Sequence, residues 1–150
     1  MTKEEIENLL NREHLKLASI AKRSTAFFLD ELLLSLLLIV AIWDSFSQIT
    51  TSVEAIELVQ RFTMEYIALK IIYQTFFIYQ YGATIGKIAM KIRVLEIRTL
   101  SNPSIPSSFN RAVFRIVSEM FMYLGFLWGM FDPAKRTWHD LTAKTLVIEN

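Results

Sequence analysis

The sequence predicts an all-α membrane protein with an N-terminal amphipathic helix, two transmembrane helices, and a third apolar helical segment that crosses the bilayer or returns. Of the 150 residues, 53% are hydrophobic, which exceeds the share usual in soluble domains. Three apolar runs of roughly 20 residues follow one another, and each matches a hydrocarbon core about 30 Å thick. The length allows a single domain.

Composition also excludes several classes of function. The 16 basic and 15 acidic residues nearly balance, so bulk charge does not indicate nucleic acid as a partner. The sequence has no cysteine, and it has two histidines, His14 and His139, so a thiolate or histidine metal site is not expected. No motif supplies a nucleophile or a cofactor fold. We therefore expect a protein that is not an enzyme, with no catalytic residue, metal or cofactor.

Residues 1–22 are predicted to form an amphipathic helix. Ile6, Leu10 and Leu17 recur at roughly helical spacing, and the acidic residues that precede the first apolar run are not typical of a signal peptide. The helix either lies at the cytoplasmic membrane surface or packs on the rest of the protein, and the sequence leaves both interpretations open. Residues 23–150 are predicted to form the membrane domain.

Three segments supply the predicted membrane helices. The first is flanked by Lys22 and Arg23 at one end and by Trp43, a residue typical of membrane interfaces, at the other. The second is less apolar because charged and amide side chains lie within it. The predicted spans are 25–43, 62–81 and 112–131.

The distribution of basic residues predicts the topology. Lysine and arginine before the first span place the N-terminus in the cytoplasm of a multi-pass protein. Three full crossings would leave the basic C-terminal tail outside, against this rule, so we favour a third segment that returns. Its bend is expected near Gly125 and Gly129. The β-branched run 92–98 is then expected to pair with 144–148 as a small cytoplasmic sheet.

Charged residues inside the first span need partners. Asp30 and Glu31 lie within the apolar run, and Arg23 lies two helical turns before Asp30 on the same face. Ala26 lies between them, and a small residue there lets another helix approach closely. An isolated charge in mid-membrane costs roughly 3 kcal/mol on insertion scales. The two carboxylates must therefore pair or take up a proton.

Partners for these carboxylates occur in the later segments. Lys70 lies near the centre of the second span, with Gln74 one turn away. Arg115 and Glu119 share one face of the third segment, four residues apart. We expect either first-span carboxylate to pair with Arg115, and Glu119 to pair with Lys70 or Arg115. The network either locks the helices together or forms an ion or substrate path. The residues predicted to form it are Asp30, Glu31, Lys70, Gln74, Arg115 and Glu119.

Two local patterns carry less weight. Residues 82–87 resemble a phosphate-binding loop, but three residues separate the glycines instead of four, and Ile88 stands where a magnesium-binding hydroxyl is needed. We reject that interpretation. His139 and Asp140 could form a base and its orienting carboxylate, but no matching nucleophile occurs, so the start of a helix is the better interpretation.

The ordered set of motifs resembles the RDD family of bacterial membrane proteins. The R-x-x-A-x-x-x-D pattern from Arg23 to Asp30 is similar to the family's opening, and Asp140 matches its second aspartate. Lys144 stands where the family usually has glycine, a departure that concerns the local turn. Further matches are the G-x-T-x-G-K segment at 82–87, the paired Arg111 and Arg115, the basic-x-x-H-D ending at 135–140 and the T-x-V at 145–147.

The resemblance implies a bacterial inner-membrane protein that acts as a transport component or a cation/proton exchanger, with Na⁺ or H⁺ on buried carboxylates. The family motif residues carried over are Arg23, Asp30 and Asp140. The alternative is a non-enzymatic scaffold or accessory subunit, whose buried charges hold helices together and whose basic cytoplasmic face docks a partner or anionic lipid. Besides the lipid bilayer, expected partners are a second copy or another membrane protein, for which Gly125-x-x-x-Gly129 offers a packing face.

Overall fold

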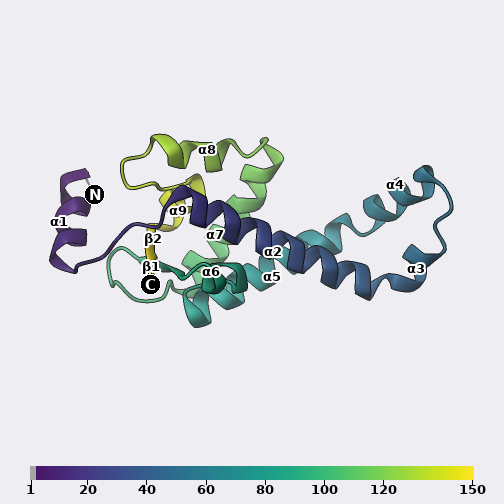
Figure 1. The fold of residues 1–150 in the computed structure, drawn as a ribbon, viewed down its shortest axis with the longest axis horizontal. Coiled ribbons are helices and arrows are strands. Elements are labelled where there is room, and N and C mark those ends of the chain that lie inside the picture. Colours follow the sequence, from purple (N-terminus) through teal and green to yellow (C-terminus); the bar gives the residue numbers. More distant parts are fainter. Residues whose placement is uncertain (1–2) are drawn as a thin grey trace.

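The computed structural model describes residues 3–150 as an elongated, mostly helical protein with a small sheet near one end (Figure 1). The N-terminal helix, the sheet and the C-terminus gather at that end. Two long helices, α2 (Ile20–Ala41) and α5 (Thr63–Tyr81), extend away from it toward a pair of short helices at the opposite end. The arrangement therefore separates a mixed helix–sheet end from a purely helical end.

The N-terminal helix α1 (Lys3–Arg12) is shorter than the predicted helix over 1–22. Its apolar residues Ile6 and Leu10 are buried against Leu95 and Leu146 of the sheet. After the helix the chain runs extended, and Leu17 forms a bridge with the C-terminal strand. Of the two interpretations left open by the sequence, the structure has the helix packed on the rest of the protein.

Helix α2 contains the first predicted span. It begins after Ser19, whose side chain accepts a hydrogen bond from the Lys22 amide, as N-cap serines commonly do. Its 22 residues give a length of about 33 Å, and most of its side chains are exposed and apolar. The helix ends at Ala41, so Trp43 opens the next helix and does not close this one.

A helical hairpin joins the two long helices. It consists of α3 (Trp43–Ser47) and α4 (Ser52–Arg61), and Thr51 with Glu54 forms a capping box at the start of α4. Helix α5 then covers the second predicted span, 62–81, and ends at Gly82 in a left-handed conformation with φ 68°. Within residues 3–150, α2 is the one continuous helix long and apolar enough to cross a membrane.

The predicted pairing of 92–98 with 144–148 is confirmed. Strand β1 (Ile92–Glu96) pairs antiparallel with β2 (Thr145–Glu149), with Val94 opposite Val147. Alternate residues point to opposite faces of a sheet, and here both faces are covered. One face packs on α1. The other packs on Ala18, on Ala26 of α2 and on Ile78 of α5.

The third apolar segment, 112–131, is not one straight helix. It is divided between α7 (Ile105–Met120) and α8 (Leu124–Phe131), which meet at an angle of 104°. The bend lies at 121–123, where Met122 and Tyr123 have positive φ angles, and not near Gly125 and Gly129 as the sequence suggested. Helix α9 (Trp138–Ala143) then leads the chain back to β2.

The two glycines of α8 serve close packing within the chain. An added Cβ at Gly125 would meet Ser118 and Trp138, and one at Gly129 would lie 3.0 Å from Thr137 Cγ2. Both glycines are buried. Because this face is occupied by the protein's own α7 and α9 segments, it does not offer the free packing face that the sequence suggested for a second copy.

Candidate functional site

Asp30 is fully buried and is held by neutral donors. Its Oδ1 accepts hydrogen bonds from the Tyr73 hydroxyl at 2.7 Å and from the Gly86 amide at 2.8 Å. Its Oδ2 accepts from the Thr84 hydroxyl at 2.6 Å. Helix α6 (Ile85–Ala89) begins just after Thr84, so the carboxylate satisfies an amide that has no partner within that helix. The predicted alternative in which Asp30 pairs with Arg115 is therefore wrong.

Small residues make this contact geometrically feasible. Gly86 packs so closely on α2 that an added Cβ would clash with the Ala26 carbonyl oxygen and lie 2.9 Å from Asp30 Oδ1. Ala26 is itself fully buried. The sequence predicted a close approach at Ala26, and the structure identifies the approaching element as the short helix α6.

Glu31, the neighbour of Asp30, belongs to a closed ring of four charges. Arg115 donates to it at 2.8 Å and Lys70 at 3.0 Å. The same two cations bind Glu119, Arg115 through Nε at 3.3 Å and Lys70 through a short contact. Each charge in the ring thus has two partners of opposite sign, which is the arrangement that offsets the desolvation cost of burying charge. Of the two first-span carboxylates predicted as partners of Arg115, Glu31 is the one that pairs with it, and Glu119 pairs with both Lys70 and Arg115, where the sequence predicted one or the other.

Gln74 was predicted to belong to the same network, but it does not hydrogen-bond to those side chains. It is 5% exposed, and its Nε2 donates to no acceptor in the described structure. A buried donor without an acceptor costs about 1–3 kcal/mol, so this amide is a feature that the packing by itself does not explain.

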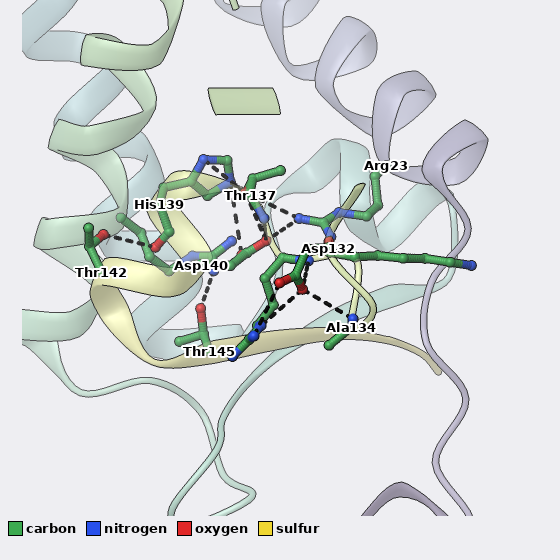
Figure 2. Close-up of polar contacts among 11 residues, drawn as sticks. Arg23, Asp132, Ala134, Thr137, His139, Asp140, Thr142 and Thr145 are labelled. Atoms are coloured by element: carbon green, nitrogen blue, oxygen red, sulfur yellow. Dashed lines mark hydrogen bonds and ion pairs between the residues drawn. The ribbon is translucent and has the colours of Figure 1, made fainter. Parts of the chain in front are cut away.

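Asp140 forms the centre of a second cluster (Figure 2). It forms ion pairs with Arg23 at the start of α2 and with Arg111 of α7. Arg23 also donates to the Lys135 carbonyl, and Arg111 to the Thr145 hydroxyl. The cluster therefore joins the first turn of α2, the first half of α7, and the α9–β2 segment at one place.

Asp140 also begins a helix, as the sequence predicted. It accepts from the Thr137 amide at 3.0 Å and forms a capping box at the N-terminus of α9. Burial alone would raise the pKa of the Asp140 carboxyl, but Arg23 and Arg111 hold it well below its usual range. The aspartate is therefore ionised at neutral pH and is bound on both sides.

His139 is buried beside this cluster, and its Nε2 lies 3.9 Å from Asp140 Oδ1, beyond hydrogen-bond distance. Burial lowers its pKa well below the usual value, with repulsion from Arg111, Arg23 and Arg115 adding to the effect, although Asp140 opposes it. The ring is neutral at pH 7. It packs edge-on against Phe126 at a centroid distance of 5.2 Å.

The sequence analysis did not identify several residues that build these contacts. Tyr73 was not singled out by the sequence pattern, yet its hydroxyl donates a hydrogen bond to Asp30. Thr84 and Gly86 were noted as part of a motif but without a partner. Arg111 was noted only as one of a pair of arginines, and its separation from Arg115 by one turn is the signal that could have located it.

Between the two clusters lies a cavity, here called the basic cavity, of about 60 Å³ measured as the space open to the centres of water molecules. Phe27 and Phe126 form apolar parts of its wall. Across residues 3–150, no Asp or Glu side chain lines it. The polar lining residues include Arg23, Gln74, Lys87, Arg111, Arg115 and His139.

In the described part of the chain, no group of three or more His, Asp or Glu side chains could hold a metal ion. The fully buried Asp30 and Asp140 and the partly buried Glu31 and Glu119 are all engaged by the chain's own donors.

One long apolar helix, a broken apolar segment and buried ionic clusters define a helical membrane-protein domain. The family model described as RDD family matches residues 17–144, so the chain belongs to the RDD family. Comparison with curated proteins and with solved structures found no match.

Proposed function

We propose that this RDD-family domain is a non-enzymatic membrane scaffold or accessory subunit, in which buried charges fasten the helices in one fixed arrangement. The observation that carries the proposal is that all four carboxylates of the site, buried or partly buried, are already bound by the chain's own donors. Asp30 accepts three hydrogen bonds, and Glu31, Glu119 and Asp140 are each bound by two cations. Removing one member of such a pair leaves an uncompensated buried charge, which costs about 3–5 kcal/mol.

The clusters connect elements that are far apart in the sequence. The four-charge ring ties α2, α5 and α7 together, and the Asp140 cluster ties α2 and α7 to α9. In a lipid environment the hydrophobic effect between helices is weak, so polar contacts and close packing decide which helices associate. This placement supports a role in which the charged clusters lock the helices together. The exposed basic residues near the sheet would face a partner or anionic lipid.

A transport component or cation/proton exchanger is the second candidate function. Asp30 favours it, because this carboxylate is bound by neutral donors and can accept H⁺ or Na⁺ without first breaking an ion pair. The basic cavity argues against it, because the four positive side chains that line this cavity would repel a cation there.

The proposed setting is the bacterial inner membrane, with the N-terminus in the cytoplasm and more than one crossing. The start of α2 contacts the C-terminal strand, since Ala18 donates to the Val147 carbonyl and Lys22 pairs with Glu149. The 104° bend between α7 and α8 supports a segment that returns to the side on which it began. In this topology the α3–α4 hairpin faces the opposite side.

A flux assay distinguishes the two functions. Wild type, Asp30→Asn and, as a matched control, Glu65→Gln, which changes an exposed carboxylate on α5, are placed in vesicles at equal protein levels. A Na⁺ gradient is imposed and internal pH is followed. A scaffold gives no Na⁺-dependent proton flux in any of the three, and Asp30→Asn lowers the melting temperature. Flux in wild type and Glu65→Gln that disappears in a folded Asp30→Asn protein would establish the exchanger instead.

The topology is tested by labelling, which the absence of cysteine makes simple. Single cysteines replace the exposed residues Lys16, Gln48 and Asn150. In oriented vesicles, we expect an impermeant maleimide to label positions 16 and 150 from the same side and position 48 from the other. Labelling of positions 150 and 48 from the same side would refute the returning segment.

A further inference from the structure

The buried ionic groups around the basic cavity do not balance. The two clusters and the cavity wall contain five cations, counting Lys70, and four carboxylates. One positive charge is therefore in excess when His139 is neutral. The charged groups concerned are Arg23, Lys70, Lys87, Arg111 and Arg115, with Asp30, Glu31, Glu119 and Asp140.

The excess charge is located at Lys87. Its ammonium group donates to the Thr84 hydroxyl at 3.3 Å, and no described carboxylate forms an ion pair with it. Burial lowers the pKa of Lys87 to about 7, an effect that Asp30 opposes and that Arg115, Arg111 and Arg23 reinforce. The Asp30 carboxylate shares the Thr84 hydroxyl with this ammonium and favours its charged form, but it does not restore the usual lysine pKa.

Two buried donors in the cavity wall also lack acceptors. They are Gln74 Nε2 and Arg111 Nε, on side chains that belong to residues 5% and 3% exposed. Arg111 Nη1 donates hydrogen bonds to Asp140 and to Thr145, whereas Arg111 Nε remains available for a further acceptor. The side chains of Gln74 on α5, Lys87 on α6 and Arg111 on α7 all line this one cavity.

We propose that the basic cavity binds a phosphate group, either free in solution or as the headgroup of an anionic phospholipid. Phosphate oxygens accept hydrogen bonds from several directions, and arginine guanidinium groups match them in geometry. The volume of about 60 Å³ exceeds the roughly 10–15 Å³ that one water needs, so it has room for a small oxyanion. A cation would find no carboxylate among the described lining residues.

This site is independent of the helix-locking function. The ring of Glu31, Lys70, Arg115 and Glu119 and the Asp140 cluster hold the helices whether or not the cavity is occupied. A bound phosphate would instead neutralise the excess charge and satisfy the orphan donors. Failure of one proposal therefore leaves the other intact.

The experiment measures melting temperature in neutral detergent with increasing sodium phosphate, against sodium chloride at matched ionic strength and pH. A ligand that binds only the folded state raises the melting temperature, and at about 100 times its dissociation constant the rise is at least about 5 °C for a chain of this size. A second arm uses nanodiscs of phosphatidylcholine with and without phosphatidic acid, which presents the phosphate on a lipid.

The variants separate binding from folding. Lys87→Met removes a cation that is unpaired in the empty protein, so we expect a higher melting temperature without phosphate and no response to it. Gln74→Leu removes an orphan donor and should also lose the response. Lys91→Met, which changes an exposed lysine four residues further along the chain, should respond like wild type.

Each outcome has one meaning. A phosphate-specific rise that is lost in Lys87→Met and Gln74→Leu supports a site for free phosphate. A rise with phosphatidic acid alone, lost in the same two variants, supports the lipid headgroup as the source. No rise in either arm, or the same rise in wild type and Lys87→Met, overturns the proposal.

Discussion

Replacing Gly86 by alanine should separate α6 from α2 and break the Asp30 site. The ideal Cβ would clash with the backbone carbonyl of Ala26 and lie 2.9 Å from Asp30 Oδ1, whereas ordinary contacts begin at 3.4 Å. Because the Ala26 oxygen belongs to the backbone of a long helix, it cannot rotate away. Helix α6 must move outward by at least about 0.5 Å, which is the difference between the last two distances.

Two costs and one gain set the change in the free energy of unfolding. Forcing an extra carbon into a packed site costs about 1–3 kcal/mol. The outward shift also lengthens the 2.8 Å hydrogen bond from the Gly86 amide to Asp30, and a hydrogen bond to a charged group contributes about 1.5–3 kcal/mol. Alanine recovers up to about 1 kcal/mol of helix propensity. We expect a net loss of about 3 kcal/mol in the free energy of unfolding, or roughly 6–12 °C in melting temperature.

The assay is thermal unfolding in detergent, followed by the loss of the monodisperse peak in size-exclusion chromatography. Gly129→Ala is the matched control, because its Cβ would meet the Thr137 methyl carbon at 3.0 Å and other atoms only at 3.5 Å or more. A side-chain methyl group can shift, so this variant should melt within about 2 °C of wild type, the loss from close contact being offset by helix propensity. Equal melting temperatures for Gly86→Ala and wild type would refute the close approach of α6 to Asp30.

Three further changes test other parts of the fold. Asp140→Asn leaves Arg23 and Arg111 without a buried anion, so we expect a loss of about 3–5 kcal/mol in the same melting assay, and a loss under 1 kcal/mol would contradict the cluster. Lys144 has a left-handed backbone with φ 54°, so Lys144→Gly should raise stability by about 1 kcal/mol; a decrease would show that its side chain matters more than the strain. Burial lowers the pKa of His139, an effect that Arg111, Arg23 and Arg115 reinforce and that Asp140 opposes. Below about pH 6.5 the His139 ring therefore stays neutral in the folded protein but takes up a proton in the unfolded chain. Stability should therefore fall as pH decreases below that value, and His139→Gln should make the fall less steep; equal slopes in the two proteins would rule out His139 as the cause.

The sequence predicted the long helices, the pairing of 92–98 with 144–148 and most of the four-charge ring. The members of the ring could be paired from their helical spacing. Two residues four apart lie on the same face of a helix, so both can contact residues at a matching depth on the neighbouring helix. The ring consists of Glu31, Lys70, Arg115 and Glu119. Lys144, which stands where the family usually has glycine, put the local turn in doubt, and the structure shows that it adopts the left-handed conformation. These features depend on local geometry, which a linear pattern records.

Other features could not be read from the pattern. Helix α1 ends at Arg12, and residues 16–18 pair with β2, a partner more than a hundred residues away in the sequence. The bend between α7 and α8 lies at Met122 and Tyr123, residues with no sequence signal for positive φ. The glycines that seemed suited to a bend instead lie where the chain needs close packing on α9.

By itself, the sequence determined that Asp30 and Glu31 must be compensated, because a charge in hydrocarbon is too costly to leave alone. Only the tertiary structure decided how. Adjacent residues on a helix point about 100° apart, so the two carboxylates face different neighbours. Glu31 faces the cations of α5 and α7, and Asp30 faces the hydroxyl and amide groups around α6. The same rotation and packing left a space lined by cations without an anion, a property that no segment of the chain carries alone.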